Sequence, residues 1–188
     1  MKQFLASLFC LLLAIPAPAQ PPTIIEQAFR SVVQVNSTIP GGGSTYCSGV
    51  IIGIVRVLTA KHCVVKDVTV NGVPSRTVKE DDWLSLLEVS PQHSLMELAK
   101  TNPVDGDEAT TIGYVDMAGT RLTLKRHVAG FGEIREGKIF MFLDGPLVQG
   151  MSGGPVINAK GQLIGINQMT NPFTGAATTL KEIRKFLK

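Results

Sequence analysis

The chain has 188 residues, of which 44% are hydrophobic and 18% are charged, and this composition excludes an intrinsically disordered protein. Its 19 glycines and 11 prolines follow no G-x-y period, which excludes collagen and predicts many turns. The formal net charge of +3 is too small and too evenly spread to indicate nucleic-acid binding.

The first 19 residues have the pattern of a signal peptide. Lys2 supplies a positive charge, a mostly apolar run follows over residues 4–15, and A-P-A at 17–19 fits a signal-peptidase site. The run is shorter than the about 20 residues that a bilayer span needs. A buried N-terminal helix is the alternative, but such a helix would have a polar face. We therefore expect a secreted or periplasmic protein that begins at Gln20 and has no membrane association after the signal is removed.

Short apolar or alternating runs, separated by turn residues, fill most of the mature chain. A short helix is predicted at 24–29, a glycine loop at 41–43, and a tight hairpin turn at Asn71-Gly72. Strands at this spacing are typical of an all-β sandwich or barrel. The predicted strands cover 31–36, 47–54, 56–59, 68–70, 83–89, 110–114, 121–128, 133–143 with a turn at Glu136-Gly137, 156–157 and 162–167.

The chain divides at the turn-rich stretch 91–106, which predicts an N-terminal half over 20–102 and a C-terminal half over 103–188. Only the end changes to a helical period. Thr179 and Glu182 form a predicted capping box there, and apolar residues follow on one face of a C-terminal helix. These apolar residues are Leu180, Ile183 and Phe186.

Removal of the signal peptide, which contains Cys10, leaves Cys47 and Cys63. An even number of cysteines in an exported protein favours a disulfide, and two buried free thiols or half of a metal site are the alternatives. A structural zinc site needs about four ligands at close spacing. The three histidines, His62, His93 and His127, are scattered along the chain, so no metal site is predicted.

Two segments carry chemistry, T-A-K-H-C at 59–63 and G-M-S-G-G-P at 150–155. A serine between glycines lies where the backbone adopts unusual dihedrals, and there the N–H groups of Gly150 and Ser152 can converge into an oxyanion hole. A serine is a poor nucleophile near neutral pH. Ser152 therefore needs a base such as His62, and that base needs an orienting carboxylate.

These two segments resemble the T-A-x-H-C and G-x-S-G-G-P motifs of the chymotrypsin-like (trypsin-fold) serine proteases. The resemblance covers roughly residues 31–177. It implies an all-β fold of two packed six-stranded antiparallel β-barrels with a C-terminal α-helix. It also implies a Cys47–Cys63 disulfide that braces the histidine loop, and a reaction in which Ser152 attacks, His62 accepts its proton and no cofactor takes part.

The acid of the triad is harder to place. An ungapped match on Leu86-Leu87 would put Trp83 at the acid position, and tryptophan cannot accept a hydrogen bond from imidazole. We therefore infer a shift of one residue, absorbed by a β-bulge, which selects Asp82, with Asp81 as the second choice. The alternative is that both aspartates only cap a strand.

The resemblance also suggests a substrate pocket without an acid at its base. The predicted pocket residues are Pro146, Leu147, Gln149, Gln168, Met169 and Thr170. Apolar walls favour apolar substrate atoms and penalise an unpaired charge, so we expect cleavage after small or medium apolar residues. Met151 precedes the nucleophile where many family members have aspartate, and this predicts the absence of their ion-pair activation switch.

The sequence thus predicts a secreted, monomeric serine endopeptidase that acts on proteins or peptides. A non-catalytic relative that binds proteins on the same fold is the alternative, because fold does not fix function. A third possibility retains the nucleophile but transfers the acyl group to an acceptor other than water.

Overall fold

The structure is a computed structural model that describes residues 21–135 and 137–188. The predicted signal peptide, and Glu136 of a predicted turn, lie outside the described residues. Neither α-helix in the described part of the chain is long and apolar enough to cross a membrane.

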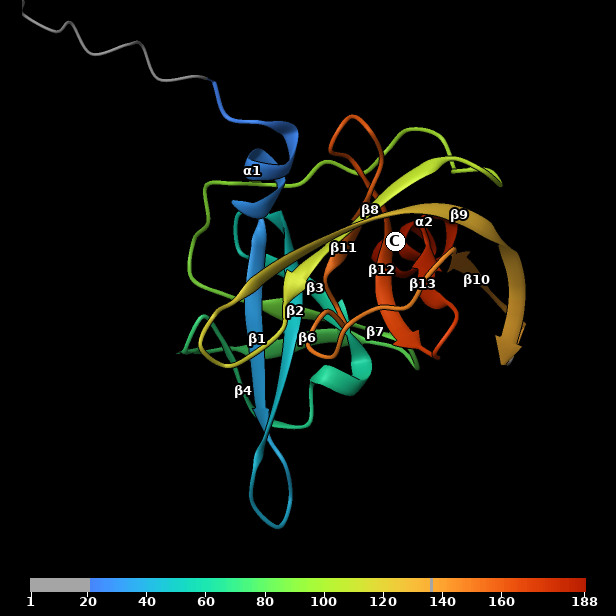
Figure 1. Ribbon diagram of the computed structural model, residues 1–188. Helices are drawn as coiled ribbons and strands as arrows, with labels where there is room; N and C mark the ends of the chain where they lie inside the picture. The colour runs from blue at the N-terminus through green and yellow to red at the C-terminus, as the bar shows by residue number, and fades with distance from the viewer. Residues whose placement is uncertain (1–20, 136) are drawn as a thin grey trace, which may run out of the picture.

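The N-terminal half is a seven-stranded antiparallel sheet with the strand order β5-β4-β1-β2-β3-β7-β6. It lies on the left of Figure 1, in blue to green. Its strands are β1 (Val32–Thr38), β2 (Ser44–Gly53), β3 (Arg56–Ala60), β4 (Lys66–Val70), β5 (Val73–Pro74), β6 (Arg76–Glu80) and β7 (Leu84–Glu88). The predicted N-terminal barrel is here a curled half-barrel sheet, and it has seven strands rather than six because β6 forms an additional edge strand against β7.

The C-terminal half is a closed six-stranded barrel with the order β10-β13-β12-β11-β8-β9, yellow to red in Figure 1. Its strands are β8 (Glu108–Tyr114), β9 (Arg121–Arg135), β10 (Lys138–Leu143), β11 (Pro155–Ile157), β12 (Leu163–Thr170) and β13 (Gly175–Thr179). The predicted break between 128 and 133 is absent. The single long strand β9 pairs with β8 along its first part and with β10 along its second part.

Three helical segments complete the fold: α1 (Ile24–Phe29), the 3-10 turn η1 (Lys61–Cys63) and α2 (Leu180–Leu187). Helix α2 begins after Thr179, whose side chain accepts a hydrogen bond from the Glu182 N–H at 3.3 Å. The reciprocal bond of the predicted capping box is absent among the described residues. The three predicted apolar residues of α2 are buried, so the expected face is confirmed.

The largest core cluster lies between the two halves. Val50 and Leu58 of the sheet pack there with Ile112 and Ile166 of the barrel, and all four are fully buried. This shared core brings η1 and the segment before β11 to the same face of the molecule, because β3 leads directly into η1. The two chemical motifs therefore meet although they are distant in the sequence.

Candidate active site

The histidine loop and the serine turn line one pocket of ≈390 Å³. His62 comes from η1 and Ser152 from the turn before β11, and Gly150 lies beside them. The full lining comprises Ile39, Ser44, Thr45, Tyr46, Cys47, His62, Leu147, Val148, Gln149, Gly150, Ser152, Met169 and Thr170.

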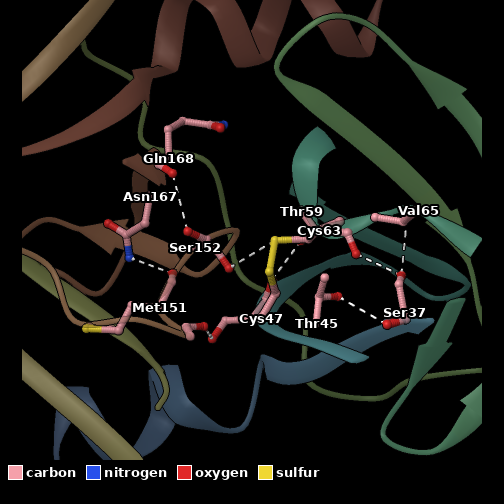
Figure 2. Close-up of a disulfide and its surroundings, with 12 residues drawn as sticks. Ser37, Thr45, Cys47, Thr59, Cys63, Val65, Met151, Ser152, Asn167 and Gln168 are labelled. Atoms are coloured by element: carbon pink, nitrogen blue, oxygen red, sulfur yellow. Dashed lines mark hydrogen bonds between the residues drawn. A yellow bond between two sulfur atoms is a disulfide. The ribbon is translucent and has the colours of Figure 1, made fainter. Parts of the chain in front are cut away.

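The predicted disulfide between Cys47 and Cys63 is confirmed, and it joins β2 to η1. Figure 2 shows Ser152 beside it, and the Ser152 carbonyl oxygen lies 3.7 Å from Cys63 Sγ. A ring nitrogen of His62 lies within 4.8 Å of both sulfur atoms. These three residues resemble a metal-ligand cluster only in composition, because sulfurs that are bonded to each other offer no thiolate.

The turn around Ser152 is shaped by glycines packed against the first sheet. Gly150 has φ +91° and Gly153 has φ +79°, and a Cβ on Gly153 would lie only 2.1 Å from Thr59 Oγ1. Within residues 21–135 and 137–188, neither the Gly150 N–H nor the Ser152 N–H donates a hydrogen bond. These two donors are therefore free to bind an anionic oxygen.

The Ser152 hydroxyl is half-buried and donates to the Gln168 carbonyl oxygen at 3.3 Å (Figure 2). That distance is long for a bond between oxygens, so the hydroxyl is held weakly. No hydrogen bond joins it to His62 among the described residues. His62 is exposed on one side, but the protein atoms packed around its ring remove part of its hydration and lower its pKa below the ordinary value of 6.5, so the imidazole is neutral at neutral pH.

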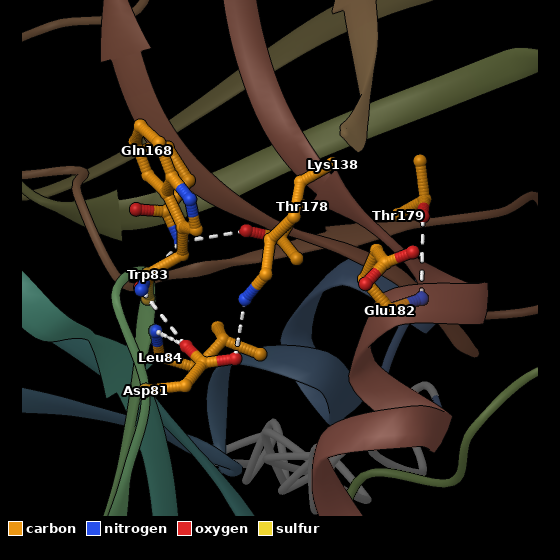
Figure 3. Close-up of polar contacts among 8 residues, drawn as sticks. All are labelled: Asp81, Trp83, Leu84, Lys138, Gln168, Thr178, Thr179 and Glu182. Carbon is orange, nitrogen blue, oxygen red and sulfur yellow. Dashed lines mark hydrogen bonds and ion pairs between the residues drawn. The ribbon is translucent and has the colours of Figure 1, made fainter. Parts of the chain in front are cut away.

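Neither candidate aspartate contacts His62 in the described part of the chain. Asp82 is exposed, whereas Asp81 accepts hydrogen bonds from the N–H groups of Trp83 and Leu84, both at 2.8 Å, and pairs with Lys138 (Figure 3). Burial alone would raise the pKa of Asp81. The ion pair with Lys138 and the two N–H donors outweigh burial, and the pKa of Asp81 is lowered.

Trp83 lies beside the histidine loop and is bonded to it through its backbone. Its carbonyl oxygen accepts hydrogen bonds from the Lys61 N–H at 2.9 Å and from Gln168 Nε2 at 3.0 Å. Its ring packs edge to face on Phe140, with 4.7 Å between ring centroids. The position that the ungapped match assigns to the acid thus carries an indole. The role predicted for Asp82 stays a prediction.

Four of the six predicted pocket residues, Leu147, Gln149, Met169 and Thr170, line the pocket. Pro146 and Gln168 do not line it. The Pro146 carbonyl accepts from Arg126 at 2.9 Å, and the buried Gln168 amide turns toward Thr178 and Trp83. Sequence reasoning missed Val148, and also Ile39 and residues 44–46, which come from the loop and strand before Cys47. The signal that could have found the residues before Cys47 is their position next to the disulfide.

The sequence profile of the trypsin-like peptidase domain matches residues 47–166. The chain belongs to this family. The match spans the disulfide, both motifs and most of the barrel, and it confirms the resemblance. No curated protein sequence matches the chain.

Solved structures agree with the family in fold. The active form of the Rv3671c protease from M. tuberculosis has a TM-score of 0.75 and 18% identity, over 100% of this chain and 92% of that one. A serine endoprotease from Yersinia pestis has a TM-score of 0.73 and 24% identity, over 90% of this chain and 66% of that one. The HtrA-type protease AlgW with a tripeptide has a TM-score of 0.71 and 20% identity, over 88% of this chain and 62% of that one. At these identities the likeness is one of fold.

Proposed function

We propose that this trypsin-like protein is a secreted serine endopeptidase with Ser152 as nucleophile and His62 as general base. The observation that carries the proposal is the shared pocket, where both side chains lie beside the unengaged N–H groups of Gly150 and Ser152. A binding surface alone has no need of a neutral imidazole, a serine hydroxyl and two free donors at one place.

In the proposed reaction, the Ser152 hydroxyl turns from the Gln168 carbonyl toward His62, which takes its proton as the oxygen attacks the peptide carbonyl carbon. The N–H groups of Gly150 and Ser152 bind the oxyanion. The C–N bond then breaks, and His62 returns the proton to the leaving amine. Water hydrolyses the acyl-enzyme by the same steps, with His62 again as base.

The pocket supports the expected preference for small or medium apolar residues before the cleaved bond. Among the described residues that line it there is no aspartate, glutamate, lysine or arginine. Asp144 is the acid nearest in sequence to the predicted base of the pocket. Its carboxylate is hydrogen-bonded to His127, to Nδ1 at 2.9 Å and to the backbone N–H at 3.0 Å. Digestion of a peptide library should give cleavage after apolar residues. Cleavage mainly after Lys or Arg would contradict this preference.

Secretion is proposed from the N-terminal pattern together with the disulfide, which forms and persists in oxidising compartments. N-terminal sequencing of the exported protein should find Gln20 at the start of the chain. An intact Met1 in the exported protein would refute the cleavage site. We also propose that the mature protein is a monomer.

The second candidate function is a non-catalytic binding module, and one observation favours it. In the described part of the chain, His62 has no carboxylate partner, and Trp83 occupies the acid position of the ungapped match and bonds to the histidine loop only through its backbone carbonyl. Loss of the orienting acid lowers the turnover of such triads by about 10⁴-fold without changing their geometry. The two candidates therefore differ in serine reactivity rather than in shape.

A fluorescent fluorophosphonate probe separates the two functions. The mature protein should be labelled and the Ser152→Ala variant should not. Asp82→Asn and Asp81→Asn, measured beside them, identify the acid as whichever variant slows labelling. A folded, disulfide-bonded wild-type protein that takes no label would overturn the enzyme and favour the binding module.

A further inference from the structure

Ser48 of β2 makes two hydrogen bonds to the serine turn of the other half and two more to neighbouring strands. Its buried hydroxyl donates to the Gly150 carbonyl at 2.9 Å and accepts from the Tyr114 N–H at 2.8 Å. Its backbone N–H donates to the Ser152 carbonyl at 2.8 Å. Its own carbonyl accepts from Thr59 Oγ1 at 2.7 Å. One residue of the sheet thus holds both ends of the turn.

These contacts fix the peptide planes on either side of the Ser152 N–H. The Gly150 carbonyl belongs to the 150–151 peptide and the Ser152 carbonyl to the 152–153 peptide. The 151–152 peptide lies between these two and carries the Ser152 N–H. Its orientation is therefore restricted from both sides. With both carbonyls directed toward Ser48, the turn leaves the Gly150 and Ser152 N–H groups unengaged.

We propose that Ser48 is a positioning residue that holds the oxyanion-binding N–H groups of Gly150 and Ser152 in their productive orientation. This inference rests on the proposed function. It differs from a general packing role because the anchored atoms are the carbonyl groups of the two residues that bind the oxyanion. Preorganised donors are effective only when they stay aimed at the developing charge.

The surroundings of Ser48 leave little room for another solution. A Cβ on Gly113 would lie 2.8 Å from Ser48 Oγ, and a Cβ on Gly154 would lie 3.1 Å from Ser48 Cβ. An alanine fits the same space but leaves the Gly150 carbonyl and the Tyr114 N–H without their partner. Buried groups that lose a partner are costly, so the turn would relax to recover one.

The kinetic test compares wild type with Ser48→Ala on a peptide substrate. We expect kcat to fall about 10²-fold, since displacement of catalytic groups by about 1 Å has that effect. KM should stay within about twofold, because the lost interaction acts in the transition state. Thr179→Ala is the matched control. It removes a helix cap outside the pocket, and should lower the melting temperature with kcat unchanged.

Amide hydrogen exchange gives a readout that does not depend on activity. The N–H groups of Met151, Gly153 and Gly154 each donate a backbone hydrogen bond in the turn. In Ser48→Ala their exchange should rise at least about tenfold above the change in the rest of the barrel. An equal rise everywhere, or no rise at these three amides, would overturn the role of Ser48.

The two measurements separate the possible failures. If wild type takes no fluorophosphonate label but the three amides respond, the proposed enzyme fails and the anchoring by Ser48 stands. If wild type is active and Ser48→Ala retains its kcat, the positioning role fails. If Ser48→Ala does not fold, Ser48→Gly takes its place. It also removes the hydroxyl and needs no additional space, so exchange at the three amides should again rise above that of the rest of the barrel, and an equal rise everywhere would overturn the proposal.

Discussion

His62 has surroundings unusual for a general base, because its ring lies against a disulfide and no carboxylate pairs with it in the described residues. Partial loss of hydration around the ring lowers its pKa, although the residue as a whole is exposed. An orienting aspartate would act in the opposite direction and stabilise the imidazolium. The pKa of His62 therefore shows whether Asp82 contacts His62 during catalysis.

The pH profile of the proposed reaction follows from this. His62 must be neutral to accept a proton, so activity is lost as pH falls through its pKa. We expect the acidic limb of kcat/KM to have its midpoint below the ordinary histidine value of about 6.5. The profile should be measured in wild type and Asp82→Asn. A wild-type midpoint above about 7 that falls in Asp82→Asn would show instead that Asp82 contacts His62.

Gly153 is a second residue at which the local geometry allows one prediction. Its φ of +79° disfavours any side chain, and a Cβ would meet Thr59 Oγ1 at 2.1 Å and the Ser48 carbonyl oxygen at 2.2 Å. We expect Gly153→Ala to lower the free energy of unfolding by at least about 3 kcal/mol. Urea denaturation measures it. Gly137→Ala is a control with a positive φ and open space, and should cost less.

Elements whose signal is local are those that the sequence predicted best. Asn71 and Gly72 have φ of 49° and 78°, as the Asn-Gly pattern requires, and they join β4 to β5. Edge strand β6 was missed because its residues are all exposed and show no alternation of burial. The break predicted within β9 is absent because pairing with two neighbours keeps the strand continuous.

The site residues also divide into those with a local sequence signal and those without one. His62 and Ser152 could be predicted because each lies inside a short motif that fixes its own surroundings. The acid could not be, since its position depends on how the connection from β6 to β7 is folded, and Asp81 caps that connection by accepting from Trp83 and Leu84. Ser48 was missed because its partner Gly150 is 102 positions away.

Helix α2 offers a prediction at the scale of one element. Its N-cap Thr179 satisfies one of the free N–H groups of the first turn. Thr179→Ala should lower the free energy of unfolding by about 1 kcal/mol, and Thr179→Ser should restore most of it. Thermal denaturation of the three proteins checks this. Equal stability of the alanine and threonine proteins would show that packing of α2 alone holds the helix.

At the scale of the whole molecule, the ion pair of Asp81 and Lys138 joins the sheet to the barrel. The two side chains are only 31% and 20% exposed. Asp81→Asn should therefore lower the free energy of unfolding by about 1–2 kcal/mol at pH 7.

The pH dependence of this effect has a definite sign. The pKa of Asp81 is lowered in the fold, so its contribution is complete above the unfolded value of about 3.9 and is lost as pH falls through the folded value. The stability difference between wild type and Asp81→Asn should be constant from about pH 5 upward and vanish in stronger acid. Denaturant titrations across this range measure it. A difference that grows in acid would show that Asp81 is not the group responsible.

The core between the halves also determines how the molecule unfolds. Val50 and Leu58 from one side and Ile112 and Ile166 from the other are fully buried against a common centre, to which α2 adds Ile183. Each half in isolation would expose one wall of that centre to water. The protein is therefore one cooperative unit. A single cut in the exposed stretch 101–102 would leave two fragments that remain associated, and each would be unable to fold when expressed alone.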